Sequence, residues 1–229
     1  MALKLTPRLQ AVADHVPPGA RLADVGTDHA YLPAWLLLEE RIPFAVCTDL
    51  RKGPLDRARE TVEHYGVANR VSLRLGDGLA GLDSEEVDCV AIAGMGGETI
   101  LHILGQAPWT AEKSCVVQPM SSLGDLRAGL GGLGLRIARE TIVREGETLY
   151  IVMDLVRGRE GPLTAAEQLV GRAANHTGDA LWPEYLAQEI RRVRRALTGL
   201  AQSGKAENQA RSEELKAALA GLEQMEKEL

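Results

Sequence analysis

The chain has 229 residues, of which 45% are hydrophobic and 25% are charged, a normal balance for a globular protein with a sizeable core. Lysine and arginine total 26 against 32 aspartate and glutamate residues, and the resulting net charge of -6 excludes a globally basic nucleic-acid binder but not a local basic patch. Aromatic residues make up only 3% of the chain, which argues against a surface built from many stacking rings.

Cysteine usage and hydropathy limit the class of protein further. Cys47, Cys89 and Cys115 stand far apart without a CxxC pair, which excludes a disulfide framework and a zinc site of the usual spacing. We expect them to be buried free thiols in a reducing compartment. The N-terminus lacks the apolar core of a signal peptide, and no apolar run approaches the roughly 20 residues that span a bilayer. These features predict a cytoplasmic protein with no metal and no membrane partner.

Short apolar runs alternate with amphipathic stretches over the first part of the chain. The runs have the length and composition of strands buried on both faces, and the stretches between them have helical periodicity. Such alternation predicts an α/β fold with a parallel sheet between two layers of helices. The expected strands are 21–25, 44–49, 71–75, 87–93 and 114–118, and the expected helices are 30–39, 52–65, 98–105 and 123–130.

The alternation ends in a pair of strands. Residues 135–144 and 148–156 read as consecutive strands on either side of Glu145-Gly146-Glu147. A polar, glycine-containing turn between two alternating runs predicts an antiparallel hairpin. The whole pattern predicts a Rossmann-like sheet of parallel strands with a C-terminal antiparallel hairpin.

A polar segment with glycine and proline, 158–162, is the best domain boundary and divides the chain into 1–157 and 158–229. Helical patterns follow it, beginning with a capping box at Thr164 and Glu167. Two apolar seams then predict a coiled-coil-like antiparallel pair of helices, interrupted by residues 202–209. The seams are Leu186, Ile190, Val193, Leu197 and Leu200, and then Leu215, Leu219, Leu222 and Met225.

Four arginines flank the seam residue Val193 on the first of these helices. One interpretation is a solvated helix face, and the other is a ridge that contacts phosphates of a nucleic acid. The helical segment itself is either an RNA-binding element or a self-packing or dimerising hairpin. The four residues are Arg191, Arg192, Arg194 and Arg195.

Two aspartates stand on either side of a glycine at the end of the first expected strand and just after it, in the pattern Asp24-x-Gly26-x-Asp28. A glycine at the tip of such a strand, opening into a helix, is typical of a nucleotide-like ligand at the strand ends. The dinucleotide fingerprint G-x-G-x-x-G is not met, because Asp28 holds the second glycine position and Tyr31 the third. A carboxylate there would repel a pyrophosphate. The motif therefore favours a ligand with a cationic or neutral polar tail.

Two more carboxylates close the next two strands. Asp49 ends the second strand and can accept hydrogen bonds from both hydroxyls of a ribose. Asp77, between Gly76 and Gly78, follows the third strand and can accept from an adenine amino group. Each aspartate alone is also typical of a turn. Together they describe a phosphate-free site for an adenosine with a cationic tail, which fits S-adenosylmethionine.

The ends of the fourth and fifth strands complete the expected site. Gly94-Met95-Gly96-Gly97 is either a tight turn or a floor on which a flat base or a methyl donor can lie close. Gln118, followed by Pro119, offers an amide for hydrogen bonds to a base edge, although a strand-end turn explains the pair equally well.

The chain resembles the bacterial TrmK family of tRNA (adenine-22-N1)-methyltransferases along essentially its whole length. The resemblance is carried by the runs ADVGTDHAYLP (23–33), KGP (52–54), RLGDGL (74–79), IAGMGG (92–97) and QP (118–119). It implies a class I methyltransferase domain followed by a helical extension, S-adenosylmethionine as donor and tRNA as acceptor. One departure is Met120, which stands where a polar residue, often asparagine, is expected.

The motifs and the resemblance together assign residues to roles. We expect catalytic contributions from Asp28, His29 and Tyr31, and RNA contacts from Gln118, Pro119 and the four arginines. Asp28 would balance charge on the methylated base, accept a hydrogen bond from the base amino group, bind the donor amino group or cap the following helix. His29 would accept a proton or be structural, and Tyr31 would stack on the base or pack. We expect donor contacts at Asp24, Gly26, Thr27, Asp28, Asp49, Leu50, Asp77, Gly78, Gly94, Met95 and Gly96.

Two other functions remain open from the sequence. A methyltransferase for a small molecule or a protein would share the donor site, and the acidic total and few aromatics favour it mildly. A binding module that keeps only the shell of the fold is the non-enzymatic alternative, against which the intact Asp24, Asp49 and Asp77 argue. The expected assembly is a monomer or a weak homodimer.

Overall fold

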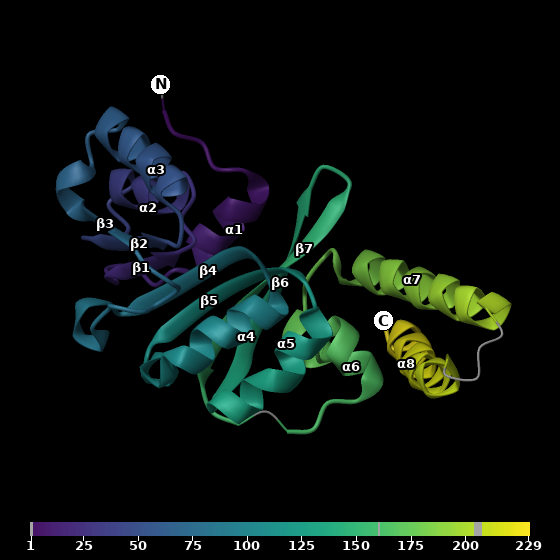
Figure 1. Cartoon of the computed structure of the whole chain (residues 1–229). Helices are drawn as coiled ribbons and strands as arrows, with labels where there is room; N and C mark the ends of the chain where they lie inside the picture. The colour runs from purple at the N-terminus through teal and green to yellow at the C-terminus, as the bar shows by residue number, and fades with distance from the viewer. Residues whose placement is uncertain (1, 160, 204–207) are drawn as a thin grey trace.

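The computed structural model describes residues 2–159, 161–203 and 208–229. Within these residues the strands form one seven-stranded sheet in the order β3-β2-β1-β4-β5-β7-β6 (Figure 1). The first five strands are parallel, and β6 and β7 form an antiparallel hairpin that joins the sheet at β5. The strands are β1 (Leu22–Val25), β2 (Ala45–Asp49), β3 (Val71–Leu75), β4 (Cys89–Gly96), β5 (Ser114–Ser121), β6 (Leu135–Glu145) and β7 (Thr148–Arg157).

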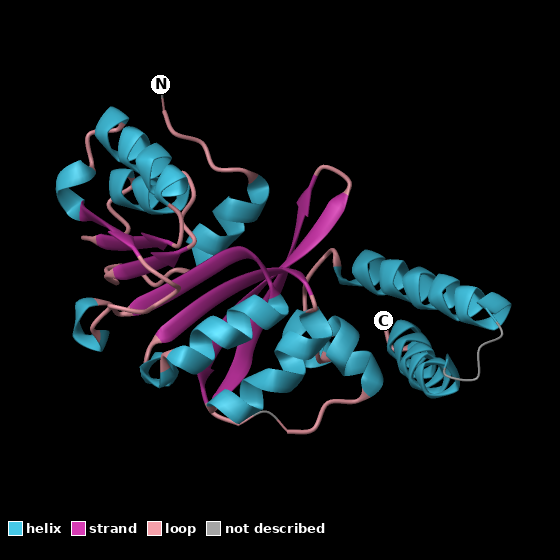
Figure 2. Ribbon diagram, viewed as in Figure 1, coloured by secondary structure: helices cyan, strands magenta, loops and turns pink. Residues whose placement is uncertain are grey.

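Helices cover both faces of this sheet (Figure 2). One face packs against α1, α2 and α3, and the other packs against α4 and α5. Three further α-helices follow the last strand in the described part of the chain. The helices are α1 (Pro7–His15), α2 (Tyr31–Leu38), α3 (Lys52–His64), α4 (Gly97–Gln106), α5 (Leu123–Leu130), α6 (Ala165–Val170), α7 (Trp182–Ser203) and α8 (Gln209–Lys227).

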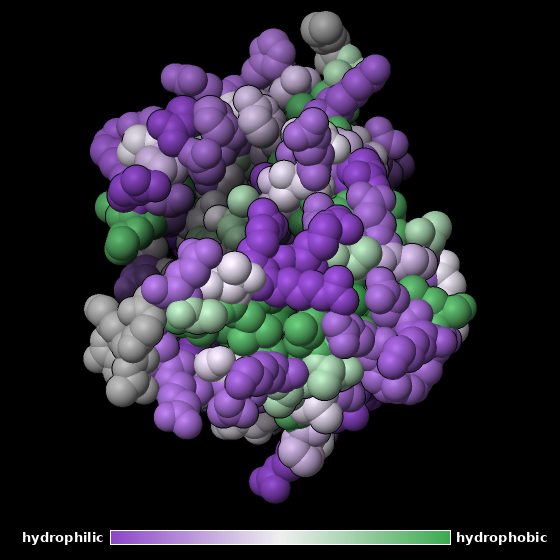
Figure 3. All heavy atoms as spheres, turned by 90° about the vertical axis from the view of Figure 1, so that its right-hand side faces the viewer, coloured by the Kyte–Doolittle hydropathy of each residue, from purple (hydrophilic) through white to green (hydrophobic). Residues whose placement is uncertain are grey.

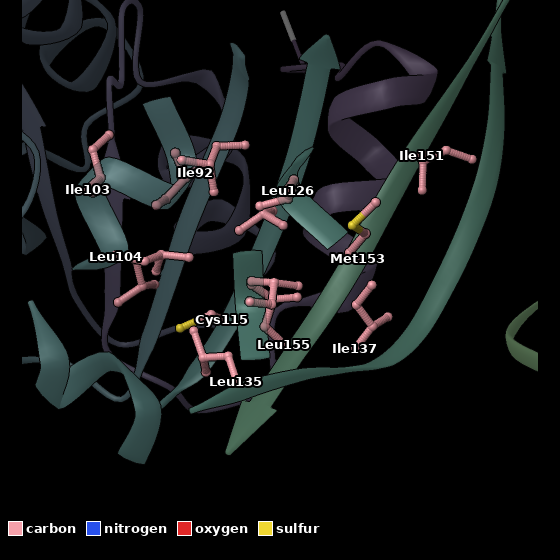
Figure 4. Packing of buried hydrophobic residues seen from close by; sticks show 14 of the residues in the cluster. Ile92, Ile103, Leu104, Cys115, Leu126, Leu135, Ile137, Ile151, Met153 and Leu155 are labelled. Carbon is pink, nitrogen blue, oxygen red and sulfur yellow. The ribbon is translucent and has the colours of Figure 1, made fainter. Parts of the chain in front are cut away.

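Side chains along the central strands alternate between the two faces, as the period of a strand requires. Ala23 and Val25 of β1 belong to the core cluster under α4 and α5, whereas Leu22 belongs to the cluster under α1, α2 and α3. Both clusters are apolar, which explains why these strands read as continuous apolar runs in the sequence. The predicted parallel sheet with a terminal hairpin is confirmed. Figure 4 shows the packing of one cluster, from Ile92 and Ile103 to Leu155.

Two elements differ from the sequence prediction. Helix α1 was not predicted, although Thr6 accepts a hydrogen bond from the Leu9 N–H and Pro7 holds the first helical position, which are recognisable start signals. Strands β4 and β5 extend beyond their predicted ends, because Met95 pairs with Pro119 and Gly96 with Ser121 after a register shift. These extra pairs carry both strands to the edge of the candidate site.

The predicted helices after residue 158 are present as α6, α7 and α8. Thr164 and Glu167 form the predicted capping box, with hydrogen bonds of 2.8 and 3.2 Å between side chains and backbone N–H groups. Parts of the predicted boundary and of the predicted interruption, residues 160 and 204–207, lie outside the described residues.

Helix α8 packs on α6 as well as on α7. A Cβ on Gly221 of α8 would lie 2.7 Å from the Ala166 Cβ of α6, so glycine is required for this close approach. The apolar cluster under α4 and α5 continues without a break into this region. The division at residue 158 therefore remains a prediction. The members of the cluster beyond it include Ala166, Val170, Trp182, Tyr185, Leu186, Ile190, Val193, Leu215 and Leu222.

Cys47, Cys89 and Cys115 are buried and free, as predicted, whereas the reducing compartment stays a prediction. None of the described helices combines the length and the apolar character required to cross a bilayer.

Candidate active site

Three carboxylates lie at the carboxyl edge of neighbouring parallel strands. Asp24 is in β1, Asp49 ends β2, and Asp77 follows two residues after β3. The three strands are adjacent in the sheet, with Asp24 opposite Cys47 and Asp49 opposite Leu75. Asp24 and Asp49 are buried, and Asp77 is exposed. The structure thus brings the three predicted aspartates to one edge.

A cavity of about 290 Å³ opens where the strand order reverses between β1 and β4. This reversal is the place where open α/β sheets bind ligands. Residues from the tip of β1, from the start of α2 and from the end of β4 line it, together with two residues of α1. The lining residues are Arg8, Leu9, Asp24, Gly26, Thr27, Asp28, His29, Tyr31, Leu32, Ala93 and Gly94.

Asp24 is the buried carboxylate of this cavity. The Thr27 hydroxyl donates a hydrogen bond to it. Burial raises the pKa of Asp24 to about 6, and the hydrogen bond from Thr27 opposes that increase only in part. A nearby cation would stabilise the charged carboxylate, so this wall of the cavity fits a ligand that carries an ammonium group.

Backbone conformation explains the two glycines of the cavity. Gly26 has φ +71° and Gly94 has φ +78°, a region that side chains disfavour. A Cβ on Gly26 would lie 2.1 Å from the Met95 Cε, so the Met95 side chain packs directly on the tip of β1. Of the predicted residues, Gly26 and Gly94 line the cavity, Met95 packs against Gly26, and Gly96 follows in β4.

Asp28 lies at the exposed lip of the cavity in a left-handed conformation, with φ +46°. It forms an ion pair with Arg57 of α3, and its Oδ2 lies 3.8 Å from His29 Nε2. Ala30 occupies the N-cap position of α2, so Asp28 does not cap that helix. Arg57 was missed in the sequence, where nothing distinguished it from the other charged residues of a solvated helix.

His29 and Tyr31 form a stacked pair beside Asp28. Their ring centroids are 5.2 Å apart with an interplanar angle of 2°. Tyr31 is exposed, which leaves part of its ring available at the lip. The predicted trio of Asp28, His29 and Tyr31 is thus brought together.

Gln118 is fully buried, and its side chain is engaged within the protein. Its Oε1 accepts hydrogen bonds from the Gly94 N–H at 3.1 Å and from Arg8 Nη1 at 2.7 Å. Its Nε2 donates to the Pro119 carbonyl at 2.9 Å. In this arrangement Gln118 fixes the end of β4, and contact with a base remains a prediction. Met120 beyond it is exposed.

Two exposed leucines flank the acidic edge. Leu50 directly follows Asp49, and Leu75 ends β3, with 67% and 64% of their surfaces exposed. An apolar side chain can pack on the face of a purine, and a carboxylate beside it can accept a hydrogen bond from the purine amino group. Leu50 was among the predicted donor contacts, and Leu75 was not.

A second cavity, of about 510 Å³, lies between the end of β5 and the helical extension. Its walls come from β5, α5, β7, α6, α7 and α8. The lining residues are Pro119, Met120, Ser121, Ser122, Leu123, Gly124, Asp125, Thr148, Leu149, Tyr150, Ile151, Gln168, Leu169, Tyr185, Glu189, Arg192 and Arg211.

The four predicted arginines of α7 are all exposed, but they differ in their partners. Arg192 lines the second cavity and pairs with Glu189 at 2.6 Å. Arg194 pairs with Glu223 of α8 at 2.7 Å. Arg195 donates to the Arg191 carbonyl. Figure 3 faces this part of the molecule, where an apolar band lies between hydrophilic side chains.

Residues 5–153 match the family described as methyltransferase domain. The tRNA (adenine(22)-N(1))-methyltransferase of Bacillus subtilis (strain 168) is 32% identical over 212 residues, which cover 90% of this chain and 89% of that protein. The chain belongs to the TrmK family of methyltransferases. The resemblance drawn from its motifs is thereby confirmed.

Solved structures of related proteins share the fold along nearly the whole chain. The crystal structure of Bacillus subtilis TrmK matches with a TM-score of 0.87 and 30% identity, covering 98% of this chain and 100% of that one. A Streptococcus pneumoniae structure in complex with S-adenosyl-L-methionine matches with a TM-score of 0.84 and 27% identity, covering 97% and 100%. The acidic strand ends and the glycines at the ends of β1 and β4 fit this donor.

Proposed function

We infer that this protein transfers a methyl group from S-adenosyl-L-methionine to N1 of adenine 22 in tRNA. The observation that carries this conclusion is the match to a tRNA (adenine(22)-N(1))-methyltransferase over 90% of the chain. The intact acidic edge of the sheet supports it, since Asp24 and Asp49 lie in adjacent strands and Asp77 follows the next strand of the sheet, β3. A tRNA substrate would place the enzyme in the cytoplasm.

The donor supplies an electrophilic methyl group on a sulfonium. We propose that Asp24 binds its ammonium group, that Asp49 accepts from its ribose hydroxyls, and that Asp77 accepts from its adenine amino group. Leu50 would cover a face of that adenine. The main chain would lie close to the donor at Gly26, Thr27, Gly78, Gly94, Met95 and Gly96.

Transfer would depend on alignment and charge. Adenine N1 carries an in-plane lone pair, so the acceptor needs no deprotonation before it attacks. The chain would hold N1, the methyl group and sulfur in line, which is a large part of such catalysis. Asp28, with His29 and Tyr31 beside it at the lip, would stabilise the positive charge that develops on the base. Arg57 now neutralises Asp28, so the ion pair between them must loosen or move for this role.

The base must leave its helix before it can react, because N1 of a paired adenine is inaccessible. We propose that the exposed arginines of α7 contact tRNA phosphates while the base reaches the cavity at β1 and β4. Pro119 borders the second cavity, and Gln118 next to it reaches Gly94 of the first, so the two cavities are neighbours.

The proposed function is tested with methyl-labelled donor and a tRNA transcript that carries adenine 22. Methylation mapped by mass spectrometry of digested tRNA to N1 of that base is expected. A transcript with guanine at position 22 should stay unmodified. Equal labelling of both transcripts, or labelling only of protein or metabolite pools, would refute the assignment.

The role of Asp28 has its own test. Asp28→Ala should lose most methyl transfer while donor binding, measured by calorimetry, stays within a few-fold of wild type. Near-normal turnover by this variant with bound donor would remove Asp28 from the chemistry.

A further inference from the structure

Arg57 of α3 pairs with the carboxylate at the lip of the donor cavity. Its Nη2 donates a hydrogen bond to Asp28 Oδ1. Its Nη1 lies 3.9 Å from the position that a Cβ on Gly53 would take, so the guanidinium lies alongside the first turn of α3. Both partners are open to solvent, with 45% of the Arg57 side chain and 59% of the Asp28 side chain exposed. A large ligand at the lip can therefore reach both groups.

An ion pair this exposed is easily exchanged for another. Water screens the attraction, and holding two mobile side chains together costs entropy, so such pairs contribute little to stability. A guanidinium also forms paired, charge-assisted hydrogen bonds with a phosphate. A tRNA that is already bound at other points presents its phosphates at a high effective concentration. A phosphate at the lip would therefore compete with Asp28 for Arg57.

The carboxylates at this edge of the sheet would otherwise repel an RNA backbone. Asp24 and Asp28 line the cavity, and Asp49 ends the neighbouring strand β2. The hydrogen bond with Asp28 is the main cause of a raised pKa of Arg57, and the charges of Asp28, Asp49 and Glu60 add to it. A phosphate that follows the target base to this edge needs a cation to offset the repulsion, and the Arg57 guanidinium is in place to supply it.

We propose that Arg57 exchanges partners when tRNA docks: it leaves Asp28, binds a phosphate next to adenine 22, and so frees the Asp28 carboxylate for the base. The inference rests on the proposed function, because it assumes a tRNA acceptor. It makes Arg57 a positioning residue that acts on the methylated base through Asp28. It also links the availability of Asp28 to the substrate, since the carboxylate stays neutralised until RNA is present.

The contact with a phosphate is tested by filter binding with unmodified tRNA at several salt concentrations. Arg57→Gln should weaken tRNA binding by about 3- to 10-fold and reduce the slope of log K against log salt by about 1. Donor binding by calorimetry should stay within about 2-fold of wild type, which controls for folding. The matched control is Arg59→Gln, which removes an equal charge from another face of the exposed side of α3. It should leave the affinity and the slope close to their wild-type values.

The exchange of partners is tested with Asp28→Asn, which removes the ion pair but keeps the shape of the side chain. If Arg57 must leave Asp28 to bind RNA, this variant should bind tRNA about 2- to 5-fold more tightly than the wild type. The gain should vanish in Asp28→Asn/Arg57→Gln, because the guanidinium that it releases is then absent. A gain that persists in the double variant would come from the loss of repulsion alone and would overturn the exchange.

The inference and the proposed function fail in different ways. Wild-type affinity and salt slope in Arg57→Gln, or an equal loss in Arg59→Gln, would overturn the inference. Methyl transfer by the wild-type chain to N1 of adenine 22 would leave the proposed function standing in that case. If the wild-type chain transferred no methyl group to tRNA, both would fall.

Discussion

Arg127 and Glu140 form an ion pair from which solvent is fully excluded: Arg127 Nη2 lies 2.7 Å from Glu140 Oε1, and neither side chain is exposed. Arg127 also donates to the carbonyls of Gln168 and Leu169, at 3.0 and 2.7 Å. These carbonyls belong to α6, whereas Arg127 is in α5 and Glu140 is in β6. One buried charge pair therefore connects the methyltransferase sheet to the helical extension.

The residues around this ion pair are tightly packed, so larger side chains would not fit beside it. Gly171 has φ +84°, and a Cβ there would lie 1.9 Å from Glu140 Oε2. His176 bonds the Val170 carbonyl at 2.8 Å and stacks on Trp182 with ring centroids 4.2 Å apart. Burial lowers the pKa of His176, which keeps the ring neutral at physiological pH. The extension is thus held by a tightly packed polar junction.

Removing one partner of the pair should be costly. Arg127→Met leaves Glu140 buried without a counter-charge, and such losses amount to about 3–5 kcal/mol. We expect a decrease of that order in the free energy of unfolding, measured in urea by circular dichroism. The double variant Arg127→Met/Glu140→Leu should recover much of the loss, because it removes the isolated charge. Full stability of Arg127→Met alone would contradict the importance of this junction.

Most helices and strands could be predicted from the sequence because each depends on residues close together in the chain. Buried strands such as β1 and β4 carry continuous apolar runs, and the capping box at Thr164 marks the start of α6. The aspartates at the strand ends could be placed for the same reason, since parallel strands end at one edge. Contacts between distant segments have no such signature. Nothing in the sequence around Arg8 indicates that it bonds Gln118, and nothing around Arg57 indicates that it pairs with Asp28.

Donor affinity should depend on pH through Asp24. Burial raises its pKa from the ordinary 3.8 to about 6 in the free protein, and a bound ammonium would lower it again. Binding at pH 5 therefore requires loss of a proton, and affinity should fall by up to about tenfold per pH unit below 6. Calorimetry in buffers of different ionisation enthalpy should detect that proton release.

The same group affects the stability of the free protein. Because its folded pKa is raised, the stabilisation by the protonated form is complete below about 4 and is lost as the pH rises through about 6. Asp24→Asn should therefore stabilise the free protein at pH 8, by on the order of 3 kcal/mol, while weakening donor binding. An unchanged pH dependence of binding in this variant would show that another group titrates.

The tip of β1 should not tolerate a side chain. Gly26→Ala places a methyl group 2.1 Å from the Met95 Cε in a backbone region of positive φ. We expect donor affinity to fall by at least about tenfold, because Met95 or the β1 tip must shift and the strained backbone disfavours a side chain. Gly26→Ala/Met95→Ala removes the clash and should regain part of that affinity, with the backbone strain remaining. Equal affinity in Gly26→Ala and the wild type would mean that the Met95 side chain is free to move away.

The arginines of α7 differ in how available they are to RNA. Arg192 and Arg194 pair with Glu189 and Glu223, whereas Arg191 and Arg195 form no ion pair among the described residues. Replacing Arg191 and Arg195 with glutamine should weaken tRNA binding and reduce the slope of log K against log salt by about 1 to 2, since each phosphate that is no longer neutralised lowers it by about one unit. The double variant of Arg192 and Arg194 should have a smaller effect, because its charges are already compensated.

The slope is measured by filter binding with unmodified tRNA at several salt concentrations. Donor binding by calorimetry serves as the control for folding, and both double variants should match the wild type there. An unchanged slope in the Arg191 and Arg195 variant would assign these residues to a solvated helix face. Equal losses of affinity in the two variants would show that the ion pairs to Glu189 and Glu223 open when RNA binds, and that all four guanidinium groups contribute to the same RNA-binding surface.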